Sequence, residues 1–188
     1  MKLNEILFNV ARINLCTEAE GPDKRMAIWF QGCTIGCPGC CNPELQEMKK
    51  AHIMTLEEIV KIAFKSKEEN DIEGVTYIGG EPTLQKYLSE LSIELSKIGL
   101  GVILFTGYKI KQLKESLISS VDLIIDGQFI ESKIDKERNL VGSTNQTFNH
   151  ISDRYIKDMD WFNVKRDFQV DINVISDLVI TGDVVIKK

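Results

Sequence analysis

Long apolar runs are missing from this sequence of 188 residues. No stretch approaches the roughly 18 apolar residues of a membrane span, so we expect no membrane partner. The opening stretch, MKLNEILFNVARINL, also lacks the continuous apolar core of a secretory signal, because Asn4, Glu5, Asn9 and Arg12 interrupt it. We therefore expect a cytoplasmic protein.

Proline is scarce, and a basic stripe is absent. The chain has four prolines, no internal repeat and no low-complexity stretch, so nothing marks an interdomain linker and we expect a single domain over residues 1–188. The net charge is −5, which gives no indication of a nucleic-acid partner. With 43% hydrophobic and 27% charged residues, the chain can bury a core and stay in solution.

What the sequence does contain is an alternation of strand and helix patterns. Short β-rich runs predict strands at 26–31, 74–82, 101–108 and 121–129. A helix predicted at 55–70 begins with the capping-box pair Thr55 and Glu58 and is amphipathic. Two further helices are predicted: one opened by Pro82 and Thr83, with Leu84, Tyr87, Leu88, Leu91 and Leu95 buried, and one carrying Ile110, Leu113 and Leu117.

This alternation favours a parallel sheet with crossover helices, either an open sheet or a partial barrel. The pattern changes near residue 130. Residues 131–155 are polar and predict a loop, whereas FQVDINVISDLVITGDVVIKK has β character and predicts a terminal hairpin or two edge strands. The stretch EILFNVARINL predicts one more strand.

Four of the five cysteines lie within nine residues, in the stretch FQGCTIGCPGCCNPELQ (30–46). Cys33, Cys37 and Cys40 have the spacing C-x3-C-x2-C, and glycines interleave them. Glycines let a backbone fold tightly around an ion or cluster. The loop follows a predicted strand, and the carboxyl ends of parallel strands are where α/β folds build their sites.

A disulfide, a zinc ion, an iron–sulfur cluster and a catalytic thiol are the candidate uses of these sulfurs. In a reducing compartment clustered cysteines more often bind metal or do redox chemistry than form disulfides, and an odd count suits pairing poorly. Zinc sites usually take two separated ligand pairs, and neither His52 nor His150 has a finger-like spacing. Three cysteines would leave one iron of a cluster open to an outside ligand, which is typical of an active site.

The C-x3-C-x2-C pattern, placed after the first strand of a βα series, resembles the signature of the radical S-adenosylmethionine (radical SAM) superfamily. The resemblance implies that Cys33, Cys37 and Cys40 hold a [4Fe–4S] cluster whose fourth iron binds S-adenosylmethionine, and that Cys16 and Cys41 are not ligands. It also implies an α/β fold of radical SAM type. That fold is a partial, open βα barrel with parallel strands, here with a β-rich C-terminal extension.

A second motif, YIGGEP, contains Gly79, Gly80 and Glu81. Taken alone it predicts a strand–helix turn in which Pro82 starts the helix. One βα unit after the cysteines, it resembles the GGE motif of the superfamily. The resemblance implies that this segment holds the methionine ammonium of the cofactor.

The remaining cofactor contacts are implied less directly. Backbone at Gly39, Cys40 and Cys41 is expected to approach adenine. Thr106 and Asp126 end the next two predicted strands. They are either ordinary strand-to-loop residues or contacts to ribose, adenine or substrate.

The motifs GPDKRMAIWFQGC, GGEP, TGY, DGQF and GSTNQ, in this order, resemble the small activating enzymes of glycyl-radical proteins, above all the activators of anaerobic ribonucleoside-triphosphate reductases. The resemblance implies a radical SAM oxidoreductase that reductively cleaves S-adenosylmethionine to a 5′-deoxyadenosyl radical. That radical would take a hydrogen atom from a glycine of a partner such as anaerobic ribonucleotide reductase. A flavodoxin-like or ferredoxin-like protein would donate the electron, and no catalytic side chain is required beyond the cluster and the cofactor.

The chain departs from this pattern at four positions. Val141 and Thr147 stand where arginines often flank the GSTNQ segment, and Asp23 and Lys24 stand where a glycine and an apolar residue are common. Such loops are where a target would be recognised. A small radical SAM enzyme that modifies a peptide or a metabolite is therefore one alternative, and a non-catalytic iron–sulfur electron carrier is another.

Overall fold

The computed structural model describes residues 2–164, together with the backbone of residues 170–174 and 178–182. The strands are β1 (Leu7–Thr17), β2 (Arg25–Phe30), β3 (His52–Thr55), β4 (Gly74–Gly79), β5 (Gly101–Thr106), β6 (Leu123–Asp126), β7 (Thr147–His150), β8 (Val170–Val174) and β9 (Leu178–Gly182). The helices are α1 (Leu56–Asn70), α2 (Leu88–Lys97), α3 (Glu115–Ile118) and α4 (Met159–Asn163), and six short 3-10 turns lie between these elements.

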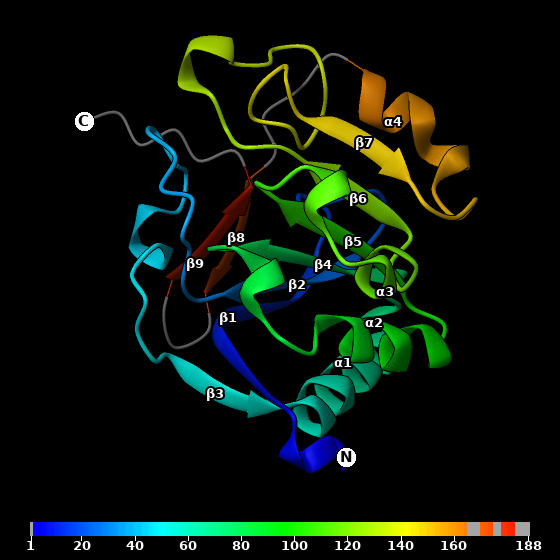
Figure 1. The fold of residues 1–188 in the computed structure, drawn as a ribbon. Coiled ribbons are helices and arrows are strands. Elements are labelled where there is room, and N and C mark those ends of the chain that lie inside the picture. Colours follow the sequence, from blue (N-terminus) through cyan, green and yellow to red (C-terminus); the bar gives the residue numbers. More distant parts are fainter. Residues whose placement is uncertain (1, 165–169, 175–177, 183–188) are drawn as a thin grey trace.

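Seven of these strands form one mixed sheet in the order β3-β1-β2-β4-β5-β6-β7. The strands β2, β4, β5 and β6 are parallel, whereas β1, β3 and β7 run antiparallel to their neighbours. The sheet is open, with β3 and β7 at its two edges, and β8 pairs with β9 as a separate hairpin. This architecture confirms the predicted α/β fold with a partial barrel of parallel strands and a β-rich C-terminal extension (Figure 1).

The main core lies between the sheet and its helices. Side chains alternate along each strand, so Met26, Ile28 and Phe30 of β2 all point to the same face. There they pack in one cluster with Ile59 of α1 and Leu91 of α2. Figure 1 shows α1, α2 and α3 together on this side of the sheet.

The opposite face of the sheet carries two smaller clusters. The first consists of Ala27, Trp29, Leu45 and Ile78, next to the loop that follows β2. The second consists of Ile103, Leu123, Ile125, Val141, Tyr155 and Phe162. Because the last three of these residues come after β6, the segment that follows β6 folds over this face. The cysteine loop and the segment after β6, which includes α4, therefore both lie on the face opposite α1, α2 and α3.

Arg25 is the centre of a hydrogen-bond network at the amino-terminal end of the parallel strands. Its side chain is fully buried, donates to the Thr76 hydroxyl and the Tyr155 hydroxyl at 2.8 Å each, and forms an ion pair with Glu73 at 2.9 Å. Arg154 also pairs with Glu73. This network connects the sheet to the segment around Tyr155, which lies 130 residues after Arg25 in the sequence.

Most predicted elements are present. The strands predicted at the start and at 26–31, 74–82, 101–108 and 121–129 correspond to β1, β2, β4, β5 and β6, and the predicted terminal hairpin corresponds to β8 and β9. The helix predicted at 55–70 is α1, and its capping box is formed: the Thr55 hydroxyl accepts from the Glu58 N–H at 3.1 Å, and the Glu58 carboxylate accepts from the Thr55 N–H at 2.7 Å.

The second helix begins later than predicted. Pro82–Leu84 forms a 3-10 turn, Gln85 is extended, and α2 starts at Leu88. The Glu81 side chain accepts from the Thr83 N–H, which caps the short turn instead of a continuous helix. Leu84, predicted to be buried, is 36% exposed as a result.

Two other expectations need correction, and one strand was missed. The third predicted helix is split into a 3-10 turn at Ile110–Gln112 and the single turn α3. The predicted loop at 131–155 contains β7, which pairs with β6 as an added edge strand. The strand β3 was not predicted, because its sequence, HIMT, is too short for a clear alternation.

Candidate functional site

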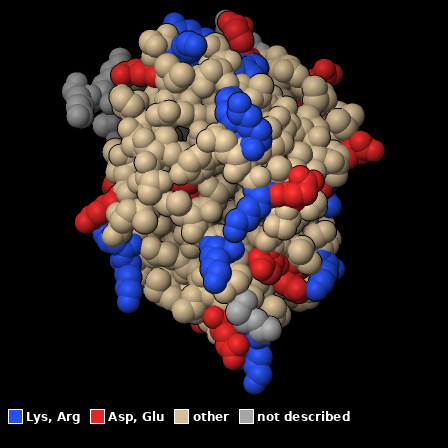
Figure 2. Space-filling view, viewed as in Figure 1, with Lys and Arg blue, Asp and Glu red and all other residues tan. Residues whose placement is uncertain are grey.

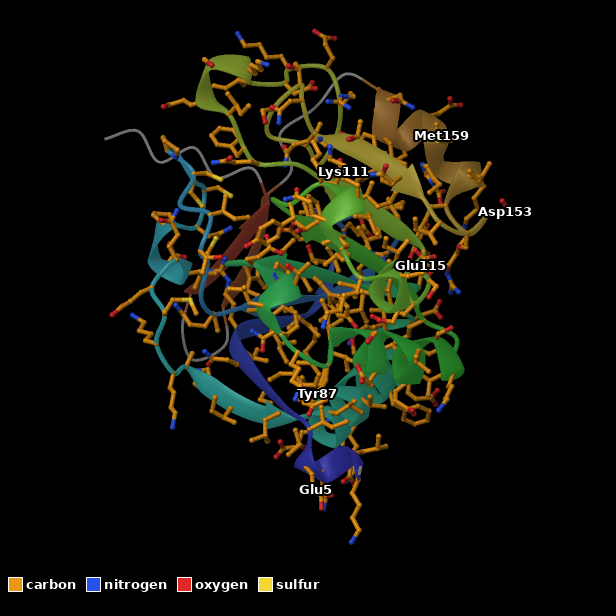
Figure 3. All side chains as sticks on the ribbon, viewed as in Figure 1. Glu5, Tyr87, Lys111, Glu115, Asp153 and Met159 are labelled. Atoms are coloured by element: carbon orange, nitrogen blue, oxygen red, sulfur yellow. The ribbon has the colours of Figure 1, made fainter. Side chains whose placement is uncertain are left out.

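The cysteine loop starts where β2 ends, and both of its ends are fixed by backbone hydrogen bonds. The Gly32 N–H donates to the Leu45 carbonyl at 2.9 Å, and the Cys33 N–H donates to the Gln46 carbonyl at 3.1 Å. Between these anchors Gly36 and Gly39 have φ values of 65° and 72°, which side chains with a Cβ rarely adopt. The interleaved glycines thus permit the tight path that brings the cysteines onto one loop, where Figure 3 shows sulfur atoms along the chain after β2.

Backbone amides point at two of the three motif sulfurs. The Ile35 N–H lies 3.4 Å from the Cys33 Sγ, and the Asn42 N–H lies 3.4 Å from the Cys40 Sγ. Such donors favour a thiolate over a thiol, and a thiolate is the form that binds metal. None of the five cysteines, all of which lie in the described part of the chain, forms a disulfide, so no such bond competes for these sulfurs.

The three sulfurs have different electrostatic environments. A hydrogen bond from the Cys41 thiol, helped by the Asn42 N–H, lowers the pKa of Cys40 to about 6 against the effect of burial. The same thiol–thiol bond, followed by burial, raises the pKa of Cys41. Burial raises the pKa of Cys37, an effect that the neighbouring Cys40 and Cys33 reinforce and that a hydrogen bond from the Phe129 backbone opposes. Of the adjacent pair, Cys40 is therefore the thiol that ionises more readily.

The donor set fits a cluster better than a single ion. Within the described residues, no three side chains among His, Cys, Asp and Glu converge closely enough to hold one metal ion. In a [4Fe–4S] cluster each thiolate binds a different iron, so three cysteine sulfurs do not have to meet at one point. The loop offers three half-buried thiols for this role, Cys33, Cys37 and Cys40.

The GGE segment is attached directly to the cysteine loop. The Gly80 N–H donates to the Phe30 carbonyl and the Glu81 N–H to the Gly32 carbonyl, both at 2.8 Å. A Cβ on Gly80 would lie 2.2 Å from that Gly32 oxygen, and one on Gly79 would lie 2.5 Å from the Phe30 nitrogen. Both glycines are therefore required by close backbone approach, and the two motifs share one edge of the sheet.

The Glu81 carboxylate is almost completely occupied by protein donors. The side chain is 1% exposed. One oxygen accepts from the Thr83 N–H, the Thr83 hydroxyl and the Thr106 hydroxyl at 3.1, 2.6 and 2.9 Å, and the other accepts from the Gly107 N–H at 2.9 Å. Glu81 thus links the end of β4 to the end of β5.

Thr106 and Asp126 lie at the same edge of the sheet and are also held by the protein. Thr106 donates to Glu81, and its backbone carbonyl accepts from the Gly127 N–H at 2.9 Å. Asp126, 2% exposed, accepts from the Ile110 N–H at 2.8 Å, from the Lys109 ammonium at 3.3 Å and from the Thr147 hydroxyl. Burial alone would raise the pKa of Asp126, but these three donors outweigh it and lower the pKa.

Three neighbours of the cysteine loop were not singled out from the sequence. Arg12 lies with its guanidinium carbon 4.5 Å from the centre of the Trp29 ring and donates to the Asn42 amide oxygen at 3.2 Å. The pairing of Arg12 with Trp29 across β1 and β2 was not predictable, because a register shift between Val10 and Arg12 changes which side chains face the loop.

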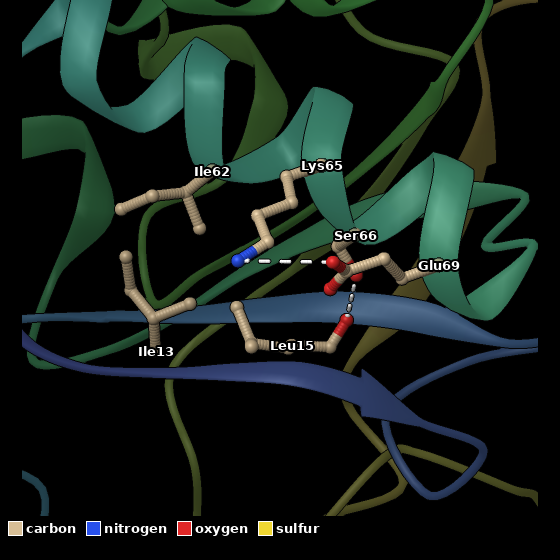
Figure 4. A pocket seen from close by; sticks show the side chains of 6 residues that line it. All are labelled: Ile13, Leu15, Ile62, Lys65, Ser66 and Glu69. Atoms are coloured by element: carbon tan, nitrogen blue, oxygen red, sulfur yellow. Dashed lines mark hydrogen bonds and ion pairs between the residues drawn. The ribbon is translucent and has the colours of Figure 1, made fainter.

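One hollow of about 240 Å³ lies away from this edge. It is formed between β1 and α1 by Ile13, Leu15, Ile62, Lys65, Ser66 and Glu69 (Figure 4). The Ser66 hydroxyl donates to the Leu15 carbonyl, and Lys65 pairs with Glu69 across the rim at 3.7 Å. None of the residues that line this hollow belongs to the cysteine loop or to the GGE segment. The hollow lies where α1 packs on β1.

The molecular surface and the helices give two further observations. On the face shown in Figure 2, acidic and basic side chains are interspersed. Within the described part of the chain, no helix is both long enough and apolar enough to cross a bilayer.

Comparison with known proteins gives consistent results. Residues 19–149 match the family model described as a 4Fe-4S single cluster domain. The anaerobic ribonucleoside-triphosphate reductase-activating protein of Enterobacteria phage T4 is 28% identical over 145 residues, which cover 74% of this chain and 92% of the relative. The protein of the same name from Salmonella typhimurium is 28% identical over 143 residues, covering 70% and 91%.

Two more distant similarities are weaker. The pyruvate formate-lyase-activating enzyme of Clostridium pasteurianum is 31% identical over 110 residues, 56% of this chain and 46% of the relative. The solved structure of QueE from Escherichia coli aligns with a TM-score of 0.44 at 19% identity, over 54% of this chain and 52% of that one. The resemblance to activating enzymes of the radical SAM type is confirmed by the sequence relatives, and with 131 of its residues (19–149) matched to the family model, the chain belongs to the 4Fe-4S single cluster domain family.

Proposed function

We propose that this chain is a radical SAM activating enzyme whose substrate is a glycine of a partner glycyl-radical protein. The observation that carries the proposal is the direct attachment of the GGE segment to the cysteine loop through the two 2.8 Å backbone hydrogen bonds. An electron carrier would need the cysteines but not this second motif. The phage T4 and Salmonella typhimurium relatives align with this chain over 92% and 91% of their length. Both are named as reductase-activating proteins, which supports the same assignment.

In this proposal Cys33, Cys37 and Cys40 hold the [4Fe–4S] cluster, and the cofactor spans the sheet edge from Gly39–Cys41 to Gly79–Glu81. When bound, such a cluster would supply the electron for reductive cleavage of S-adenosylmethionine, the chemistry that would let a hydrogen atom be taken from the glycine Cα of the partner. The chain's own residues bind, orient and exclude water.

Each part of the sheet edge has a separate role. The main-chain carbonyls of Gly79 and Gly80 are the acceptors we assign to the methionine ammonium, since the carboxylate of Glu81 is occupied by other donors. Thr106 holds Glu81 in place, and Asp126 together with Lys109 borders the side on which ribose or substrate would lie. We further propose a single domain, a cytoplasmic location and a flavodoxin-like or ferredoxin-like electron donor.

The test is an anaerobic reconstitution with iron and sulfide, followed by addition of reductant, S-adenosylmethionine and an anaerobic ribonucleotide reductase from the same cell. We expect cofactor cleavage and a glycyl radical signal in electron paramagnetic resonance, absent when the target glycine is changed to alanine. Cleavage without any radical on the reductase would favour the peptide- or metabolite-modifying alternative. A reducible cluster with no cofactor cleavage would favour the electron carrier.

A further inference from the structure

Arg12 is a cation beside the cysteine loop that has no acidic partner in the described chain. It is half-buried on β1, its guanidinium lies over the Trp29 ring at 4.5 Å, and none of the nine ion pairs among the described residues includes it. Its Nε–H is buried and has no hydrogen-bond partner among the described residues. A buried charged donor without an acceptor is unfavourable, so an oxygen ligand that reached this guanidinium would stabilise it.

The neighbours of Arg12 place it beside the proposed reaction site. Asn42 accepts from the Arg12 Nη2 at 3.2 Å, and the backbone N–H of the same Asn42 donates to the Cys40 Sγ at 3.4 Å. One residue therefore separates Arg12 from a proposed cluster ligand. The Trp29 ring, 2% exposed, packs against the guanidinium and restricts its movement. This restriction lowers the entropy lost when a ligand binds.

We propose that Arg12, stacked on Trp29, binds a carboxylate of the protein substrate beside the cysteine loop; this inference rests on the proposed function. A guanidinium offers several donors in one plane and matches the two oxygens of a carboxylate. Its charge, unbalanced by any described carboxylate, favours an anionic ligand over a neutral amide.

The order of the strands separates this position from the cofactor. Arg12 lies on β1, and β2 stands between β1 and the strand β4 that ends in the GGE segment. The methionine part of the cofactor is assigned to the β4 side. A carboxylate at Arg12 therefore has a different source, and the substrate chain that reaches the cluster loop from the β1 side would supply it.

The direct test observes the Arg12 Nε–H itself. The full chain, reconstituted anaerobically and labelled at arginine Nε, has five arginines, and the Arg12→Lys variant identifies the resonance of interest. We titrate acetyl-Asp-Gly-amide and, as the neutral match, acetyl-Asn-Gly-amide. A saturable downfield shift of the Arg12 resonance with the aspartyl peptide alone is expected. No shift, or the same shift with both peptides, would overturn the proposal.

A second arm distinguishes the two sources of carboxylate. S-adenosylmethionine is added alone and then in competition with the aspartyl peptide. We expect the cofactor to leave the Arg12 resonance in place and not to displace the peptide. If it moves the resonance and competes, Arg12 belongs to the cofactor site and the substrate assignment is wrong.

A third arm measures binding of the reductase. Arg12→Gln should weaken its affinity about tenfold, the loss expected for one charge-assisted contact. The matched control is Lys86→Gln, which removes an exposed cation that also stacks on an aromatic ring, at 4.8 Å over Tyr87, far from the cysteine loop (Figure 3). This control should stay within about twofold of wild type. Wild-type affinity in Arg12→Gln would contradict the inference even if glycyl radical forms, whereas a peptide response without glycyl radical would contradict only the proposed function.

Discussion

The carboxylate of Glu81 accepts four hydrogen bonds from three residues, so its removal should act on the fold before it acts on the cofactor. In Glu81→Gln one oxygen can still accept, but the amide nitrogen cannot accept from the Gly107 N–H. We expect a loss of about 1–3 kcal/mol in the free energy of unfolding, measured by urea denaturation, together with weaker cofactor binding and near-normal iron content. The control is Glu115→Gln at an exposed position (Figure 3). If Glu81→Gln were as stable as wild type, the fold would not depend on these hydrogen bonds. The Glu81 carboxylate would then be a candidate to bind the methionine ammonium directly.

The cysteines differ in what they are expected to do. Replacing Cys33, Cys37 or Cys40 by alanine should abolish cluster binding and cofactor cleavage, because in the proposed cluster each would bind a different iron. Cys16→Ala should keep both, since Cys16 lies on β1 and packs against the helix-side core. Iron and sulfide per chain after anaerobic reconstitution give the measurement. A Cys16→Ala protein that loses as much iron as Cys37→Ala would contradict the three-ligand assignment.

His150 should make stability depend on pH. Its ring lies edge-on to Phe162 with the centroids 5.8 Å apart. Both ring nitrogens are buried and have no hydrogen-bond partner within the described residues, and burial lowers the pKa of His150. The folded state then binds fewer protons than the unfolded state, whose histidine pKa is about 6.5. This contribution to stability is present above that pH and is lost as the pH falls below it.

The variant His150→Phe removes the titrating group and keeps an aromatic ring in the cluster. Urea denaturation at about pH 7.5 and about pH 5.5, on either side of the ordinary histidine pKa, should show a smaller loss of stability on acidification in the variant than in wild type. An equal loss in both proteins would show that His150 does not contribute to the pH dependence.

At the scale of elements, α1 was predictable because two local signals agree. Thr55 and Glu58 form the capping box, and the apolar positions recur at helical spacing. The structure adds a left-handed Asp71 directly after the last helical residue, Asn70. We expect Thr55→Ala to lower the free energy of unfolding by about 1 kcal/mol, because the hydroxyl no longer accepts from the Glu58 N–H. Thermal unfolding checks this. A variant as stable as wild type would mean that tertiary packing alone fixes the start of α1.

Other elements could not be predicted locally, for physical reasons. Pro82 and Thr83 look like a helix start, but the Glu81 side chain accepts both from the Thr83 N–H, a local contact, and from the Thr106 hydroxyl of β5, a contact that depends on tertiary structure. The strand β7 has a polar sequence, TFNH, and becomes a strand only because β6 offers a free edge. Short edge strands of this kind depend on their partner more than on their own residues.

At the scale of the whole molecule, the sequence predicted the sheet edge on which the motifs meet but not how its side chains are occupied. Strand alternation placed Cys33 and Gly80 after neighbouring parallel strands, and the structure joins their loops by hydrogen bonds. The saturation of Glu81, the pairing of Arg12 with Trp29 and the buried network of Arg25 all join residues far apart in the chain. Contacts of this kind are not encoded in local spacing.

The central claim is that a hydrogen atom passes from a partner glycine to the cofactor on this sheet edge. The most direct measurement uses an anaerobic ribonucleotide reductase labelled with deuterium at its glycine Cα positions. After incubation with the reconstituted chain, reductant and S-adenosylmethionine, mass spectrometry should find deuterium in 5′-deoxyadenosine, and none when the target glycine is alanine. Abundant 5′-deoxyadenosine without deuterium would contradict the account.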